Sequence, residues 1–278
     1  MNYLHLEHDP YGHEKRFGFF TTVFDVKEPK SILDIGCGTG EMLTVPLALK
    51  YPHIQFYGVD SDYESIAIAK ANNCPFNLKL FTSLEEVGDM QFDMVVASEV
   101  MEHVESPYDF LLALKQRVTE GGRIILTVPN GFGPFELGTL TENILHISGM
   151  LKLVKMLRKR KMVDSATVPK DTVANSPHLN YFTLKQLNSL FLDAGLSASM
   201  FKPRTFICGP FFDKVVTSFN LSQWNAAVAD KLPLFLCSDW MFEIRVAGEE
   251  KGTKWKRSIW ASKRRKFNLQ RAGLLNQI

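Results

Sequence analysis

"LDIGCGTGE", residues 33–41, decides the fold because an apolar run passes directly into a loop with a glycine at every second position. Residues 31–35 are typical of a short buried strand. Gly36, Gly38 and Gly40 let the backbone turn sharply and approach a ligand without interference from Cβ atoms. The stretch therefore predicts a ligand site at the carboxyl end of a first strand.

Further apolar runs follow, and each is short enough to be a strand; they lie at residues 54–60, 76–81, 92–97, 122–128 and 239–247. Helical patterns occur between them. The pattern at 61–73 starts with a capping box at Ser61, and the pattern at 183–195 starts with another at Thr183. This alternation predicts an α/β fold with a mostly parallel sheet.

A length of 278 residues suits one large core, so we expect a single domain over residues 1–250. Residues 137–178 interrupt the alternation and are interpreted as a lid inserted over the carboxyl ends of the strands. Residues 251–278 contain nine Lys or Arg and no acid, whereas the first 250 residues hold the other 23 cations and all 30 acids. We expect this basic tail to be solvated, with an anionic membrane surface or a nucleic acid as alternative partners.

The composition excludes several classes of protein. Hydrophobic residues make up 45% of the chain and charged residues 22%, which is typical of a soluble globular protein. The N-terminal stretch lacks the apolar segment of a signal peptide, and no later run could span a bilayer, so we expect a cytoplasmic location. The cysteines are far apart and form no CxxC pair, which argues against a zinc knuckle and a disulfide framework.

The spacing of the glycine loop bears on its ligand. Dinucleotide-binding loops follow the pattern GxGxxG, whereas this loop reads GxGxG and is preceded by Asp34, which would repel a phosphate. A cationic amino group would instead be attracted to Asp34, and S-adenosylmethionine carries one. Asp60, which ends the run at 54–60, is placed to accept hydrogen bonds from two ribose hydroxyls.

With these residues in view, the chain resembles the class I S-adenosylmethionine-dependent methyltransferases, in particular the small-molecule group that includes ubiquinone-biosynthesis O-methyltransferases. The motifs that support the resemblance are "ILDIGCGTGE", "YGVD", "FDMVVASEVMEHV", "EGGRIILTVPN" and "HLNYFT". The resemblance implies a Rossmann-like, seven-stranded sheet whose last strand is antiparallel and whose helices cover both faces. It also implies that residues 82–84 contact the adenine. The expected cofactor contacts are Asp34, Gly36, Cys37, Gly38, Gly40, Asp60, Ser61, Ser83, Ser98 and Glu99.

The segment "SEVMEHVESP", residues 98–107, contains two carboxylates and an imidazole at helical spacing. In a first helical turn Glu99, Glu102 and His103 would share one face and could converge on an ion. The segment resembles the ExxEH motif of small-RNA 2′-O-methyltransferases and of ubiquinone-biosynthesis enzymes, which implies Mg²⁺ or Zn²⁺ with His178 as the fourth ligand. The alternative is a helix start capped by Ser98, in which the acids only favour the helix dipole.

Transfer of a methyl group requires an acceptor in line with the S–CH₃ bond, and a hydroxyl acceptor must also lose a proton. His178 and His103 are the candidate catalytic bases. The predicted acceptor is a hydroxyl of a small metabolite such as a phenol, a quinone precursor or a sugar, and methylation of carbon or nitrogen stays open because this fold supports many chemistries at one cofactor site. A nucleic-acid methyltransferase and a cofactor-binding membrane scaffold without turnover are the alternatives.

Overall fold

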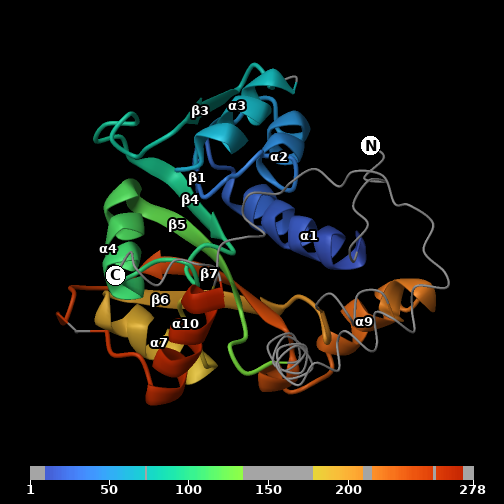
Figure 1. Ribbon diagram of the computed structural model, residues 1–278. Coiled ribbons are helices and arrows are strands. Elements are labelled where there is room, and N and C mark those ends of the chain that lie inside the picture. The colour runs from blue at the N-terminus through green and yellow to red at the C-terminus, as the bar shows by residue number, and fades with distance from the viewer. Residues whose placement is uncertain (1–9, 73, 134–177, 209–214, 253–254, 272–278) are drawn as a thin grey trace.

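The computed structural model describes residues 10–72, 74–133, 178–208, 215–252 and 255–271, which form one sheet with flanking helices (Figure 1). The predicted lid lies outside these ranges except for His178.

Seven strands form the sheet, in the order β3-β2-β1-β4-β5-β7-β6. They are β1 (Ser31–Ile35), β2 (Gln55–Val59), β3 (Leu78–Phe81), β4 (Phe92–Ser98), β5 (Val118–Pro129), β6 (Leu196–Pro203) and β7 (Asp239–Val246). Strands β1 to β5 pair in parallel, and β7 is antiparallel to both β5 and β6. The predicted fold class is therefore confirmed.

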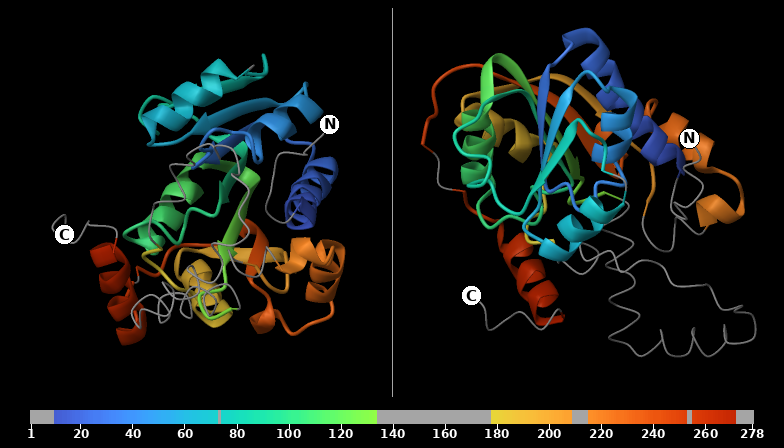
Figure 2. Two further views of the ribbon diagram at one scale, coloured as in Figure 1. Left: turned by 45° about the vertical axis from the view of Figure 1, so that its right-hand side comes forward. Right: turned by 90° about the horizontal axis from the view of Figure 1, so that it is seen from above.

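Helices cover both faces of this sheet and make it the middle layer of three (Figure 2). The helices are α1 (Pro10–Lys27), α2 (Thr44–Lys50), α3 (Tyr63–Ala71), α4 (Pro107–Arg117), α7 (Leu184–Asp193), α9 (Ser222–Ala229) and α10 (Ile259–Arg271), with a 3₁₀ turn, η2, at Leu234–Leu236. Phe20 of α1, Leu47 of α2 and Ile66 of α3 pack on one face. Leu111 of α4 and Leu187 of α7 pack on the other.

The structure confirms one of the two predicted capping boxes. Thr183 and Gln186 form the predicted capping box of α7, and Gly195, with φ +70°, follows its end. The predicted box at Ser61 is wrong. Helix α3 is capped one residue later by Asp62, whose carboxylate accepts a hydrogen bond from the Ser65 amide at 3.2 Å.

The sequence predicted a solvated basic tail, but part of this tail packs against the domain. Ala261 and Leu269 of α10 are buried, and so is the cationic side chain of Arg264. Figure 2 shows α10, in red, at the periphery of the molecule. Among the described helices, none combines the length and the hydropathy that crossing a membrane requires.

Candidate active site

The glycine loop leaves the carboxyl end of β1 and turns back against β2. The amides of Gly36 and Cys37 donate to the Val59 carbonyl at 2.7 and 3.1 Å. Gly36, Gly38 and Gly40 have φ of +78°, +54° and +73°, which explains why glycine occupies all three positions. A Cβ on Gly36 would lie 2.3 Å from Cγ2 of Val100, so the loop packs directly on the segment after β4.

Asp60 follows β2 and faces the loop. One carboxylate oxygen accepts a hydrogen bond from the Gly38 amide at 2.7 Å, and the other accepts one from the Asp62 amide at 2.9 Å. These bonds fix the orientation of the carboxylate while leaving acceptor capacity on both oxygens. Ser61 is exposed beside it, and its predicted cofactor contact stays a prediction, as does that of Asp60.

Asp34 lies near the end of β1 with only 5% of its surface exposed. Burial raises the pKa of its carboxyl group to about 7, although a hydrogen bond from the Thr44 hydroxyl and the nearby charge of Arg16 act in the opposite direction. Burial also raises the pKa of the Cys37 thiol, so Cys37 contributes to the loop as a neutral side chain.

A buried arginine that the sequence reasoning missed joins this group. Arg16 of α1 is 6% exposed and donates to the Ser98 hydroxyl at 3.3 Å, which places a guanidinium beside the ends of β1 and β4. Burial lowers the pKa of Arg16 to about 10, so it remains charged at neutral pH. Its position in α1, far from the glycine loop in sequence, gave no local signal.

Glu99 follows β4 in a left-handed conformation, with φ +58°. Its carboxylate accepts a hydrogen bond from the Thr127 hydroxyl at 2.7 Å. Burial opposes ionisation, but Arg204, the Thr127 hydroxyl and Arg16 together hold the pKa of Glu99 below its usual value. Arg204 also forms an ion pair with Asp239, at the start of β7. Glu99 therefore belongs to a buried network of charges.

The segment after β4 is a turn and not the expected helix. Helix α4 begins only at Pro107, where Ser106 caps it and proline occupies the first turn. The left-handed backbone of Glu99 cannot start a helix, so both earlier interpretations of residues 98–103 as a first helical turn are wrong.

The turn nevertheless brings three of the predicted ligands together. Ligand atoms of Glu102, His103 and His178 lie within 4.8 Å of one another. Nε2 of His103 is 3.7 Å from Oε1 of Glu102, and the rings of His103 and His178 are 5.0 Å apart. One carboxylate and two imidazoles at this separation fit a divalent cation. Glu99 is outside this group.

Two backbone hydrogen bonds hold the chain just after His178 against the turn that follows β4. The amides of Leu179 and Asn180 both donate to the Glu102 carbonyl, at 2.8 and 2.9 Å. The side chain of Asn180 donates to the Val104 carbonyl at 2.6 Å. His178, although it is 75 residues beyond His103, thus has its backbone fixed next to the turn.

The predicted adenine turn follows β3. Thr82 donates its amide to Glu86 at 3.1 Å, and Ser83 is half-buried. Two acids, Glu85 and Glu86, come directly after this turn. The contacts of residues 82–84 with adenine stay a prediction.

The glycine loop and the polar residues lie at the carboxyl ends of the parallel strands. Doubly wound α/β folds bind their ligands at this edge of the sheet. The profile of a family described as methyltransferase domain matches residues 15–198. The chain therefore belongs to the methyltransferase domain family.

Two curated relatives are similar to part of this chain. The chain is 34% identical over 145 residues to the mitochondrial ubiquinone biosynthesis O-methyltransferase of Schizosaccharomyces pombe, covering 48% of this chain and 52% of that protein. It is 35% identical over 104 residues to the ubiquinone biosynthesis O-methyltransferase of Roseobacter denitrificans, covering 36% and 41%. The chain thus spans about half, or less, of the length of these relatives.

Solved structures share the fold. Magnesium protoporphyrin IX methyltransferase from Synechocystis PCC 6803 superposes with a TM-score of 0.50 at 16% identity, over 89% of this chain and 88% of that one. A plantazolicin methyltransferase superposes with a TM-score of 0.51 at 17% identity, over 86% of each chain.

Proposed function

We propose that the protein is an S-adenosylmethionine-dependent methyltransferase that acts on a hydroxyl group of a small molecule. The observation that supports this most strongly is the buried Asp34 behind the glycine loop, together with Asp60 across it. Two acids at this position disfavour phosphate and attract the amino group of a methionine moiety. The curated relatives are O-methyltransferases by name, which favours oxygen as the acceptor atom.

Each end of the cofactor has a partner in this arrangement. Asp34 accepts a hydrogen bond from the cationic amino group, directly or through a water molecule, and Arg16 pairs with the carboxylate of the methionine moiety. Asp60 accepts from the ribose hydroxyls. The sulfonium is then held between the loop and the turn after β4.

The cluster of Glu102, His103 and His178 prepares the acceptor. A neutral His103 or His178 removes the hydroxyl proton, and the buried carboxylate of Glu102 stabilises the imidazolium that forms. A divalent cation held by these three residues would lower the pKa of the hydroxyl when bound. The carboxylate of Glu99 lies in the charge network with Arg204 and orders the backbone that leads to this cluster.

Two observations bear on the alternative partners of the tail. Arg257, Arg264 and Arg265 contact the domain, which leaves fewer cations for a nucleic acid than the composition suggested. Lys256, Lys263 and Lys266 are exposed near the exposed Ile259, and this surface suits contact with an anionic membrane. Sedimentation with anionic vesicles, compared with neutral ones, tests that contact.

The decisive experiment is incubation with methyl-labelled S-adenosylmethionine and a metabolite extract, with and without a chelator. We expect label in a small organic-soluble product. Base-stable label in RNA would favour the nucleic-acid alternative, and cofactor binding without any transfer would favour the scaffold. A rate that falls with chelator and recovers with added cation would support the cation at Glu102, His103 and His178.

A further inference from the structure

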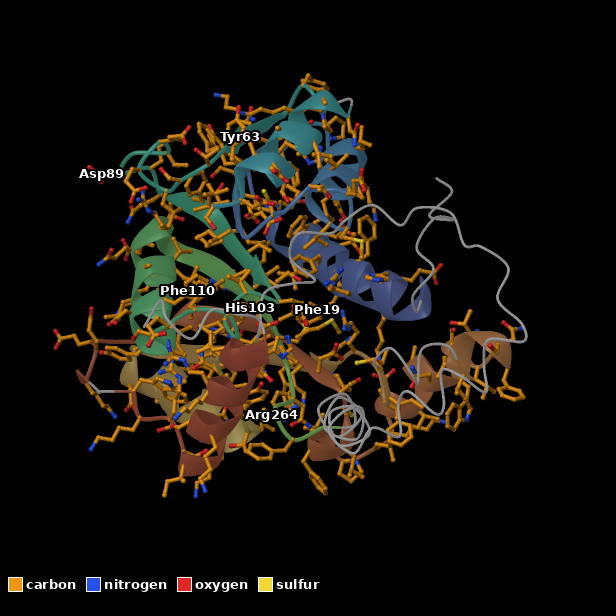
Figure 3. All side chains as sticks on the ribbon, viewed as in Figure 1. Phe19, Tyr63, Asp89, His103, Phe110 and Arg264 are labelled. Atoms are coloured by element: carbon orange, nitrogen blue, oxygen red, sulfur yellow. The ribbon has the colours of Figure 1, made fainter. Side chains whose placement is uncertain are left out.

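Four side chains of the basic tail contact the two segments that form the candidate catalytic cluster. We call Arg257, Arg264, Arg265 and Asn268 the C-terminal clamp. They lie outside residues 15–198, the part of the chain that the family profile matches. Figure 3 labels Arg264 on α10 and His103 in the turn after β4.

The clamp holds the turn after β4 through Glu105. Arg265 donates to both carboxylate oxygens of Glu105, at 3.0 and 2.6 Å, in a bidentate pair. Arg257 donates to the Glu105 backbone carbonyl and lies 3.5 Å from one carboxylate oxygen. The Glu105 side chain is 67% exposed, so the backbone contact and the bidentate geometry matter more here than the charges alone.

The clamp also holds the loop that begins at His178. Nε of Arg257 donates to the side-chain oxygen of Asn180 at 2.9 Å. The guanidinium of Arg264 lies 4.2 Å from the centre of the Tyr181 ring. Asn268 donates to the hydroxyl of Tyr181 and, at 3.4 Å, to the backbone carbonyl of His178.

These contacts converge because the loop and the turn are already joined. The Asn180 side chain, which Arg257 holds by its oxygen, uses its nitrogen to bind the carbonyls of Met101 and Val104, on either side of Glu102 and His103. Arg257 is therefore linked, through the side chain of Asn180, to the residues before Glu102 and after His103. Arg264 and Asn268 hold the same loop through the Tyr181 side chain and the His178 backbone carbonyl.

We propose that the C-terminal clamp positions the catalytic cluster, with Arg257 and Arg264 as positioning residues that set His178 against Glu102 and His103. The catalytic role of these three residues rests on the proposed function. The contacts described above join the clamp to Glu105 and to residues 178–181, which belong to the candidate catalytic cluster and its supports and are separate in sequence from the glycine loop and Asp60. The clamp therefore governs the transfer step and leaves cofactor binding unchanged.

The test uses the full chain and two double variants that each remove two positive charges. The clamp variant is Arg257→Ala with Arg264→Ala. The matched control is Lys202→Ala with Lys231→Ala, which removes two exposed positive charges from β6 and from the segment after α9. Amide hydrogen exchange of Leu179 and Asn180, which both donate to Glu102, reports the registration of the loop without requiring any activity.

In the clamp variant we expect at least a tenfold faster exchange at Leu179 and Asn180, a kcat lower by about 10- to 100-fold and an unchanged KM for S-adenosylmethionine. The lysine control should match the wild type in all three. Unchanged exchange in the clamp variant, or equal acceleration in both variants, would overturn the proposal. An inactive wild-type protein would count against the proposed function alone, because the exchange comparison decides the clamp independently.

Discussion

At the scale of single residues, Gly36 leaves no room for a side chain, since an added methyl group would collide with Val100. We expect Gly36→Ala to weaken binding of S-adenosylhomocysteine by more than tenfold, because the glycine loop must then move away from Val100. Gly88 is a matched control: its φ is +67°, and a Cβ there would meet open space. Both variants carry a backbone cost of about 1 kcal/mol from the left-handed conformation. Titration calorimetry of the two variants isolates the collision, and equal affinities would contradict this account.

Asp34 predicts a pH dependence of ligand binding. The ionised carboxylate attracts the amino group, yet the pKa of Asp34 in the free protein is about 7, so below this pH binding must release a proton. Affinity for S-adenosylhomocysteine should therefore rise between pH 6 and 7.5, by at most about tenfold per pH unit. The Asp34→Asn variant should bind more weakly at pH 7.5 and lose this dependence. A flat affinity profile in the wild type would contradict it.

The same residue affects stability with a defined sign. The folded-state pKa of Asp34 is raised above the ordinary value of 3.8, so its contribution to stability falls as the pH rises from about 4 through 7. The ligand-free Asp34→Asn variant should accordingly resist urea better than the wild type at pH 8 and differ little at pH 4. Equal urea midpoints of the two proteins at pH 8 would contradict this account, because they would show that ionisation of Asp34 does not destabilise the fold.

The sequence identified the glycines, Asp34 and Asp60 because they form a local pattern with a known spacing. It also selected Glu102, His103 and His178, which the structure brings together. Arg16 and Arg204 could not be found in this way. Each is isolated in sequence and becomes part of the site only through the packing of α1 and the end of β6.

At the scale of elements, the pair of Arg204 and Asp239 joins the end of β6 to the start of β7. Removing the cation leaves a buried carboxylate, and we expect Arg204→Met to destabilise the fold by about 3 kcal/mol at pH 8. Burial already raises the pKa of Asp239 to about 6, and without Arg204 it would rise further. The destabilisation should therefore shrink toward pH 5. Urea unfolding at both pH values measures this, and a penalty independent of pH would contradict it.

Elements with strong local patterns were predicted closely, and elements without them were not. β1 was bounded correctly by its apolar run, and α7 by its capping box and Gly195. β6 was not identified because most of its side chains are only partly buried at the edge of the sheet, so its sequence lacks an apolar run. The start of α4 was placed too early because helical spacing alone cannot reveal the left-handed residue Glu99.

At the scale of the whole molecule, ligand binding should stabilise the fold as a unit. S-adenosylhomocysteine at a concentration of 100 times its Kd should add about 2.7 kcal/mol and raise Tm by several degrees. A nicotinamide dinucleotide should leave Tm unchanged, because Asp34 and Asp60 disfavour a pyrophosphate. Asp60→Ala should abolish the shift. Thermal unfolding followed by circular dichroism tests all three, and a larger shift with the dinucleotide would contradict the assignment of the site.

The alternation of strands and helices was sufficient to predict the class of the whole fold, but the place of the tail was not predictable. A segment with nine cations and no acid has the composition of a solvated tail. Arg257, Arg264 and Arg265 pack because Glu105, Asn180 and Tyr181 form a complementary surface, and those three residues meet only in the folded chain.

The position of β7 has a consequence for synthesis on the ribosome. This strand is the last of the seven in the chain, yet it lies between β5 and β6. Until residue 246 has emerged, β5 and β6 each lack a neighbour, and their open edges are free to pair with other chains. The nascent protein therefore depends on its final strand to close the sheet, and chaperone demand should peak just before that strand is released.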